Sequence, residues 1–202
     1  MTRSRRVLAL TAALLAATVG LGACGSEPEP ANNPVQATPE HTGGPVAGPH
    51  NELDITYAKA MFTHSQQAVE LATMAASKSN NAEVKKLAET MQAEQSPYMA
   101  TLGGMLSGWG QQAPGMGGEQ GDHSDHAGAL TEAEIAKLGS LSAQKFDAEW
   151  LKAILKHHQG AISQSKKIQE MGQNPEVKKF AQQLVTVEEP QIAEIRKLYK
   201  SL

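Results

Sequence analysis

Two histidines at equivalent positions in the two halves of the chain are the residues best suited to chemistry. His64 and His157 both lie on the apolar stripe of a predicted helix, and His158 follows directly. A helical stripe of this kind faces the core, so we expect both imidazoles to be buried. A neutral imidazole nitrogen is a good ligand for copper or zinc. The pattern is therefore compatible with a transition-metal site inside a helical bundle.

Acidic and amide side chains are expected around this pair. His64 should lie opposite Pro97 on the following helix, and His157 opposite Pro190. Two imidazoles with carboxylates suit a transition metal. The candidate ligands are His64, His157 and His158, and the candidate helpers are Asp54, Met61, Glu94, Asp147 and Glu188, with Gln95, Tyr98, Glu189 and Gln191 nearby.

A purely structural role for the two histidines is the alternative. A proline inside a helix leaves the carbonyl four residues earlier without its usual donor, here at Ala93 and Thr186. A buried imidazole N–H could donate to such a carbonyl, or to an Asp or Glu side chain, because buried polar groups need partners. The sequence leaves both interpretations open.

A second histidine cluster lies in the Gly-rich segment between the two halves. It contains His123 and His126 with Asp122 and Asp125, and Met116 lies upstream. Such side chains in an exposed loop can gather around copper or zinc, although a solvated polar loop would have the same composition. We treat this cluster as a candidate site separate from the one in the core.

An internal repeat defines the elements that must position these residues. Residues 54–106 align with residues 147–199 at a constant offset of 93 without a gap. The aligned pairs include Asp54 with Asp147 and His64 with His157, and the register holds through Asn81 with Asn174 and Pro97 with Pro190. One supersecondary unit is therefore present twice.

Each repeat is predicted to be a helical hairpin. Apolar residues recur at steps of three and four, and the stripe is interrupted at 79–81 and at 172–175, where Asn, Gly and Pro can end one helix and begin the next. The two hairpins should dock into an all-α four-helix bundle. We expect it to cover 51–202, with repeats at about 51–107 and 131–202 and a Gly/His-rich connection at 108–130. In the expected up-down-up-down order, the first and third helices are parallel and diagonal, which would place His64 and His157 in one layer.

The N-terminus is predicted to direct export and anchoring. Residues 1–23 combine three arginines with an uncharged run, as in a signal peptide. Leu21-Gly22-Ala23-Cys24 resembles the lipobox of bacterial lipoproteins, in which the cysteine is lipidated. We therefore expect lipidated Cys24 to hold the protein at the outer face of the cell membrane through a polar tether, 24–50. The sequence leaves open whether the protein is exported by the general secretory or by the twin-arginine route.

Charge and composition exclude several classes of function. Without the signal peptide, 15 basic residues face 21 acidic ones, a formal charge of −6, which disfavours nucleic-acid binding. Cys24 is the only cysteine, so a disulfide and a thiolate metal site are excluded within the chain. No glutamate precedes a histidine by three residues, as a di-iron bundle requires, and no nucleophile triad is evident. We expect no enzymatic activity.

The repeat and two further segments resemble a bacterial secreted family called domain of unknown function 305. These segments are 146–151, Phe-Asp-Ala-Glu-Trp-Leu, and 157–162, His-His-Gln-Gly-Ala-Ile. The resemblance covers about 51–202 and implies a ferritin-like bundle of two repeats with a functional His-His motif, in a family with copper-associated members. This chain departs from the family pattern at Ser65, Tyr98, Ala129-Leu130, Ile154 and Gln191.

Together these features predict a lipid-anchored envelope protein that binds a transition metal, with copper favoured, in metal homeostasis. The alternative is a non-enzymatic interaction module in which the polar layer only fixes helix packing.

Overall fold

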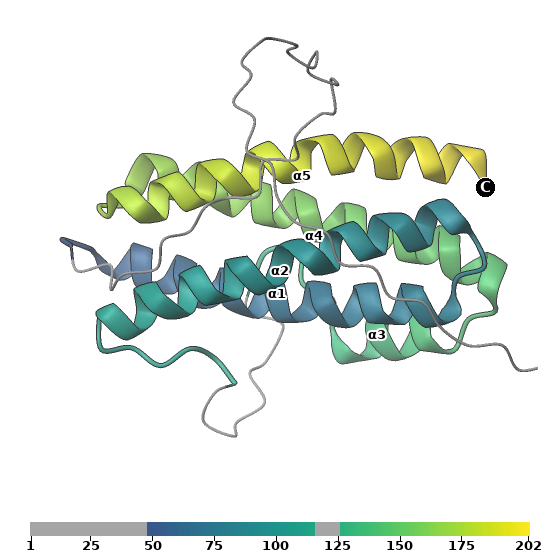
Figure 1. Cartoon of the computed structure of the whole chain (residues 1–202), viewed down its shortest axis with the longest axis horizontal. Helices are drawn as coiled ribbons and strands as arrows, with labels where there is room; N and C mark the ends of the chain where they lie inside the picture. Colours follow the sequence, from purple (N-terminus) through teal and green to yellow (C-terminus); the bar gives the residue numbers. More distant parts are fainter. Residues whose placement is uncertain (1–47, 116–125) are drawn as a thin grey trace, which may run out of the picture. The chain divides into compact units, whose positions relative to one another are not determined.

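The computed structural model describes residues 48–115 and 126–202, and the regular structure in these two ranges is entirely helical. The five helices are α1 (Glu52–Lys78), α2 (Ala82–Gly108), α3 (Glu132–Gly139), α4 (Ala143–Met171) and α5 (Pro175–Ser201), as Figure 1 shows. The predicted all-α bundle of two tandem hairpins is confirmed. Among the described helices, none combines the length and apolar character needed to cross a membrane.

Asparagine caps begin three of the long helices, two of them at the interruptions that the sequence predicted. The side chains of Asn81 and Asn174 each accept two backbone N–H bonds from the first turn that follows. Pro175 occupies the first turn of α5, where its missing N–H costs nothing. Asn51 forms a capping box with Asp54 at the start of α1, and Thr131 forms one with Glu134 at the start of α3. These local bonds fix where each hairpin turns.

Helices α1 and α4 pack against each other through residues that are equivalent in the repeat. The Tyr57 hydroxyl on α1 lies 2.7 Å from Ser165 Oγ on α4. Its counterpart, Trp150, is fully buried and donates from Nε1 to the Leu71 carbonyl at 2.8 Å. Each aromatic ring thus brings its polar atom to a partner on the opposite helix, as buried Tyr and Trp require.

These contacts show that α1 and α4 are antiparallel. Tyr57 pairs with Ser165, His64 with His157, and Leu71 with Trp150, so the numbering rises on one helix as it falls on the other. The expectation of parallel, diagonal first and third helices is therefore wrong. It assumed strict alternation of direction, which a long connection between the hairpins does not require.

The antiparallel arrangement makes the connection join opposite ends of the bundle. The start of α1, the end of α2 and the end of α4 lie together, because His50 stacks on Trp109 at 4.7 Å and Asp54 caps Gln173. Helix α4 therefore begins at the other end. A helix of this length spans about 40 Å. The chain between Gly108 and Ala143 must cover that distance, and its described part passes the middle of α1 and α4.

The first described residues are held against the bundle. The Pro49 carbonyl accepts a bond from Asn174 Nδ2 at 3.3 Å, and His50 lies on the Trp109 ring. Residues 48–50, which the sequence assigned to the tether, are thus packed at the end of α1. Cys24 and the rest of the signal peptide and tether lie outside the described residues, as do Met116, Asp122, His123 and Asp125.

Asp54 ties the two hairpins together, and its replacement tests this role. Its fully buried carboxylate accepts backbone bonds from Asn51, Gln173 and Asn174 at 2.8 to 3.2 Å. We expect Asp54→Ala to lower the free energy of unfolding by about 3 kcal/mol, because several charge-assisted bonds are lost together. Urea unfolding of the domain without its signal peptide and tether, residues 48–202, measures the change.

The repeat provides the matched control. Asp147, the counterpart of Asp54, has a buried Oδ1 without a hydrogen-bond partner among the described residues. Asp147→Ala should therefore cost clearly less than Asp54→Ala, and equal losses would contradict the capping role.

Candidate metal centre

Three buried histidines meet where α1 crosses α4. His64 comes from α1, His157 from α4 and His126 from the segment before α3, and they are 1%, 0% and 3% exposed. One ring nitrogen of each lies within 4.8 Å of one from both others. The Nε2 atoms of His126 and His157 are 3.4 Å apart. Within residues 48–115 and 126–202, these three histidines are the one group of potential ligand side chains close enough together to hold a metal ion.

The repeat explains the face-to-face contact of the first two rings. His64 and His157 are equivalent residues on antiparallel helices, so a local twofold relation brings them together at the middle of the contact. Their rings stack with centroids 3.9 Å apart and planes inclined by 13°. His126 has no counterpart in this relation. Its ring meets those of His64 and His157 edge-on, at 5.3 and 5.4 Å.

The structure joins two candidate sites that the sequence kept apart. His126 was assigned to an exposed loop cluster, but it is buried against the core pair. The missing signal was the direction of α4, because an antiparallel α4 forces the connection past the histidine layer. His123 and the other members of the loop cluster lie outside the described residues, so their placement stays a prediction.

A buried carboxyl group from α5 completes one side of the cluster. Glu188 Oε1 lies 3.2 Å from His64 Nε2, and its side chain is 3% exposed. The sequence placed Glu188 opposite His157 and Glu94 near His64, so the antiparallel packing changes the partner of His64. A carboxyl group at this position is well placed to balance a bound cation.

Burial favours the neutral forms of His64, His157 and Glu188. It lowers the pKa of His64 to about 3 and raises that of Glu188 to about 7. Burial, followed by the neighbouring histidines, also lowers the pKa of His157. The contact between His64 and Glu188 has the distance of an ion pair, but these shifts make it a hydrogen bond between neutral groups in mildly acidic solution. The imidazoles therefore have lone pairs available at neutral pH.

His158 lies beside the cluster and belongs to a separate chain of hydrogen bonds. It is 1% exposed, and its Nε2 lies 2.8 Å from Gln191 Oε1. Gln191 in turn donates from Nε2 to Glu94 Oε2 at 2.8 Å. Burial lowers the pKa of His158, with Glu188 opposing this effect. The candidate ligand His158 is therefore buried, but it is not one of the three histidines whose ring nitrogens converge.

The remaining candidate helpers have other surroundings. Asp54 uses its carboxylate as the cap described above, and its counterpart Asp147 is 5% exposed with a buried oxygen that has no partner among the described residues. Met61 is fully buried in an apolar cluster with side chains such as Phe62 and Leu102. Of the helpers that lie in the described ranges, Glu188 is the one hydrogen-bonded to a histidine of the cluster.

Of the two kinds of bond expected from a structural role, His64 forms the one to a carboxyl group, with Glu188 at 3.2 Å, whereas the bond to a carbonyl freed by a proline is not formed through Nδ1 of either histidine. Helices α2 and α5 continue through Pro97 and Pro190. Yet Nδ1 of both His64 and His157 has no hydrogen-bond partner in the described ranges. Neither imidazole therefore donates from Nδ1 to the carbonyls that the prolines leave free. Buried polar atoms without partners are uncommon in native proteins, and ligand sites are among their explanations. The donor set thus fits a metal ion.

The described residues define a class of protein: an all-α bundle of two repeated hairpins with a buried histidine cluster between them. The chain belongs to the DUF305 family, a domain of unknown function, whose family model matches residues 54–199. No curated protein sequence matches the chain.

Solved structures agree with this assignment. A DUF305 fragment from Deinococcus radiodurans matches with a TM-score of 0.69 and 26% identity over 77% of this chain and 100% of that one. A putative secreted DUF305 protein from Streptomyces coelicolor matches with a TM-score of 0.63 and 25% identity over 72% and 91%. CopM in its Cu(II)-bound form matches with a TM-score of 0.62 and 23% identity over 73% and 96%. At this identity CopM shares the fold.

The polar chain beside the cluster predicts a pH-dependent stability for the metal-free protein. Burial and nearby Glu188 raise the pKa of half-buried Glu94 to about 7, against the effect of its bond from Gln191. A raised carboxyl pKa stabilises the fold fully below the unfolded value of about 4.5 and loses that effect as the pH rises through 7. Glu94→Gln should therefore stabilise the protein by about 1 to 2 kcal/mol at pH 8, with the gain fading towards pH 4.5.

Urea unfolding at pH 5 and pH 8 measures this difference, and Glu89→Gln on the exposed face of α2 is the control. A gain at pH 8 that is the same at pH 5, or that Glu89→Gln reproduces, would contradict the buried position of Glu94.

Proposed function

We propose that this protein binds copper, as Cu(I), between His64, His126 and His157, and that it does so as a lipid-anchored protein on the outer face of the cell membrane. The observation that carries the proposal is the convergence of three buried imidazoles with ring nitrogens within 4.8 Å of one another. Copper handling of this kind needs no catalytic group, so we propose binding and transfer without enzymatic activity.

The type of ligand supports copper. Imidazole nitrogen suits copper, zinc and other late transition metals, and the described cluster offers three such nitrogens. The structure of CopM, a protein of the same fold, is known with Cu(I) and with Cu(II) bound. That property belongs to CopM, and it supports the proposal because this chain presents a donor set suited to the same metal.

The burial of the site supports a monovalent ion. All three ligands are neutral, and the cost of moving an ion out of water rises with the square of its charge. Glu188 can supply one negative charge when it is deprotonated, because its carboxyl lies 3.2 Å from His64. One negative charge balances Cu(I), whereas Cu(II) or Zn(II) would keep a net positive charge in the interior.

Metal binding should stabilise the folded protein through the cluster. We expect the domain without its signal peptide and tether, residues 48–202, to gain about 2.7 kcal/mol at a Cu(I) concentration one hundredfold above the dissociation constant, because the ion binds only the folded state. The gain should disappear in His64→Ala and in His157→Ala. Thermal unfolding under reducing conditions, with Cu(I), Ag(I) and Zn(II) compared, measures it.

His50→Ala is the matched control, because His50 stacks on Trp109 at the end of the bundle. This variant should keep the full Cu(I) gain. If none of the three ions raises the midpoint of the unaltered domain, the proposal fails and the histidine layer serves packing only.

The proposed location follows from the residues before the bundle. The lipobox-like Leu21-Gly22-Ala23-Cys24 and the polar stretch that follows support a lipid anchor with the bundle held away from the membrane. In this arrangement the metal site would meet copper before it enters the cell.

Cys24→Ser tests the anchor in cells of the native host. We expect the unaltered protein to incorporate radiolabelled fatty acid and to sediment with membranes, and the variant to do neither, because the thiol that accepts the lipid is gone. Release of both proteins into the soluble fraction would contradict the anchor and leave the metal proposal unaffected.

A further inference from the structure

We infer that Gln67 and Gly160 are positioning residues of the metal centre, which hold the segment 126–131 so that His126 is presented to His64 and His157. This inference rests on the proposed metal site for its function, but it concerns residues that touch no metal. We call the segment 126–131 the strap, because it crosses the contact between α1 and α4.

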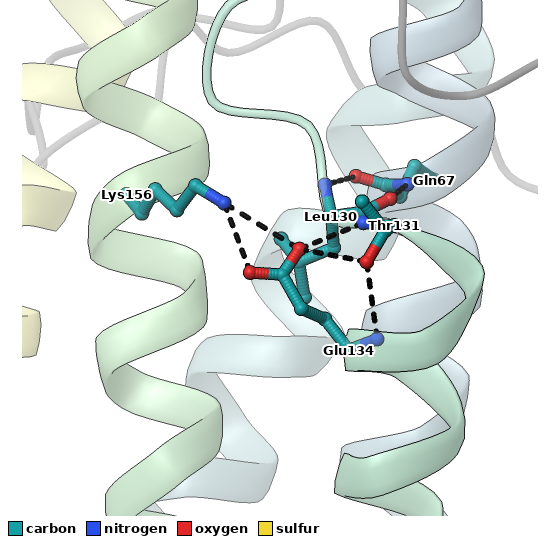
Figure 2. Close-up of polar contacts among 5 residues, drawn as sticks. All are labelled: Gln67, Leu130, Thr131, Glu134 and Lys156. Atoms are coloured by element: carbon teal, nitrogen blue, oxygen red, sulfur yellow. Dashed lines mark hydrogen bonds and ion pairs between the residues drawn. The ribbon is translucent and has the colours of Figure 1, made fainter.

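Gln67 binds the strap through both ends of its amide. Its Nε2 donates to the Leu130 carbonyl, and its Oε1 accepts from the Leu130 N–H, each at 2.8 Å. Figure 2 shows this two-bond contact between the side chain of Gln67 and the main chain at Leu130. Gln67 is fully buried and Leu130 is 2% exposed. The pair satisfies both polar groups of a buried loop residue, which otherwise would lack water and partners.

Gly160 lets the strap lie directly on the backbone of α4. A Cβ atom at Gly160 would overlap the carbonyl group of Ala127 and the nitrogen of Gly128. A Cβ atom at Gly128 would lie 2.6 Å from the Lys156 carbonyl oxygen, and Gly128 has φ +85°, in the left-handed region. Two glycines therefore allow main chain to cross main chain with no side chain between. The crossing occurs one turn from His157 and two residues from His126.

The repeat shows how specific this arrangement is. Gln67 and Gly160 occupy equivalent positions, at the same offset that relates His64 to His157. The local twofold relation therefore places them on opposite sides of the histidine layer, where the strap passes between the helices. At this position one repeat supplies an amide that binds the strap and the other supplies space for it. The two repeats therefore differ at the position where His126, which has no equivalent in the repeat, joins the histidine pair.

An exposed clip holds the far end of the strap. Thr131 and Glu134 form the capping box of α3, and Glu134 also contacts Lys156 of α4 at 3.1 Å, as Figure 2 shows. Both side chains of this ion pair are about half exposed, so the pair adds little stability. The buried contacts of Gln67 and Gly160 are the ones that fix the position of His126.

Gly160→Ala is the central test, with Cu(I) as the probe and a colorimetric Cu(I) chelator as competitor. The added methyl group should displace the strap. Because alanine favours the helical conformation more than glycine does, α4 should still form and the variant should still fold. We expect Cu(I) affinity to fall roughly tenfold or more, as for the loss of other groups that orient a ligand. X-ray absorption of bound Cu(I) should then show one imidazole fewer than in the unaltered protein.

Gly104→Ala is the matched control, because Gly104 is a helical glycine with nothing within 4 Å of the added atom. It should leave the affinity unchanged. Gln67→Met, which keeps the volume and removes both bonds to Leu130, should reproduce the effect of Gly160→Ala. Combining Gly160→Ala with His126→Ala should weaken binding no further than His126→Ala alone, since both act on one ligand.

A metal-independent readout separates this inference from the proposed function. In the metal-free protein, nuclear Overhauser contacts between the ring protons of His126 and His157 should be present in the unaltered protein and in Gly104→Ala. They should be lost in Gly160→Ala. Ring contacts or Cu(I) affinity that survive Gly160→Ala, or effects that add to those of His126→Ala, would overturn the positioning role. Absence of Cu(I) binding by the unaltered protein would overturn the proposed function, and the ring contacts would still decide the positioning role.

Discussion

The antiparallel packing of α1 on α4 is the constraint on which the rest of the structure depends. It places equivalent residues of the two repeats opposite each other, so His64 stacks on His157 while Tyr57 and Trp150 each reach across to the other helix. It also puts the end of α2 and the start of α4 at opposite ends of the bundle. The connection must then pass the histidine layer, and the layer acquires a third imidazole.

Most of the fold could be predicted because its signals are local. The repeat register, the stripe of apolar residues and the caps at Asn81 and Asn174 each depend on residues a few positions apart. The shared layer of His64 and His157 was also predicted correctly. Equivalent residues near the middle of equivalent helices lie at the same height whether those helices run parallel or antiparallel. That expectation was therefore correct although the predicted direction of α4 was wrong.

The direction of α4 could not be read from periodicity, because either direction buries the same apolar stripe. It depends on how the long connection is routed and on contacts such as Gln67 with Leu130, which link residues far apart in sequence. Because of this single error, Glu188 was expected near His157 and not near His64, and the role of His126 was missed. A connection long enough to run the length of a helix was the available clue, since a short turn would have required adjacent helix ends.

A bundle built from a duplicated hairpin offers each ligand twice, so symmetry alone gives a pair of histidines and no third. An odd ligand must come from outside the repeat, and here it comes from the connection. This has an electrostatic consequence, because Glu188 faces His64 whereas its counterpart in the first repeat is the uncharged Gln95. The layer therefore holds one carboxyl group where strict symmetry would give two or none. A single carboxyl group with neutral imidazoles matches the charge of a monovalent ion. The departures from the repeat, more than the repeat itself, suit this layer to the metal site that we propose.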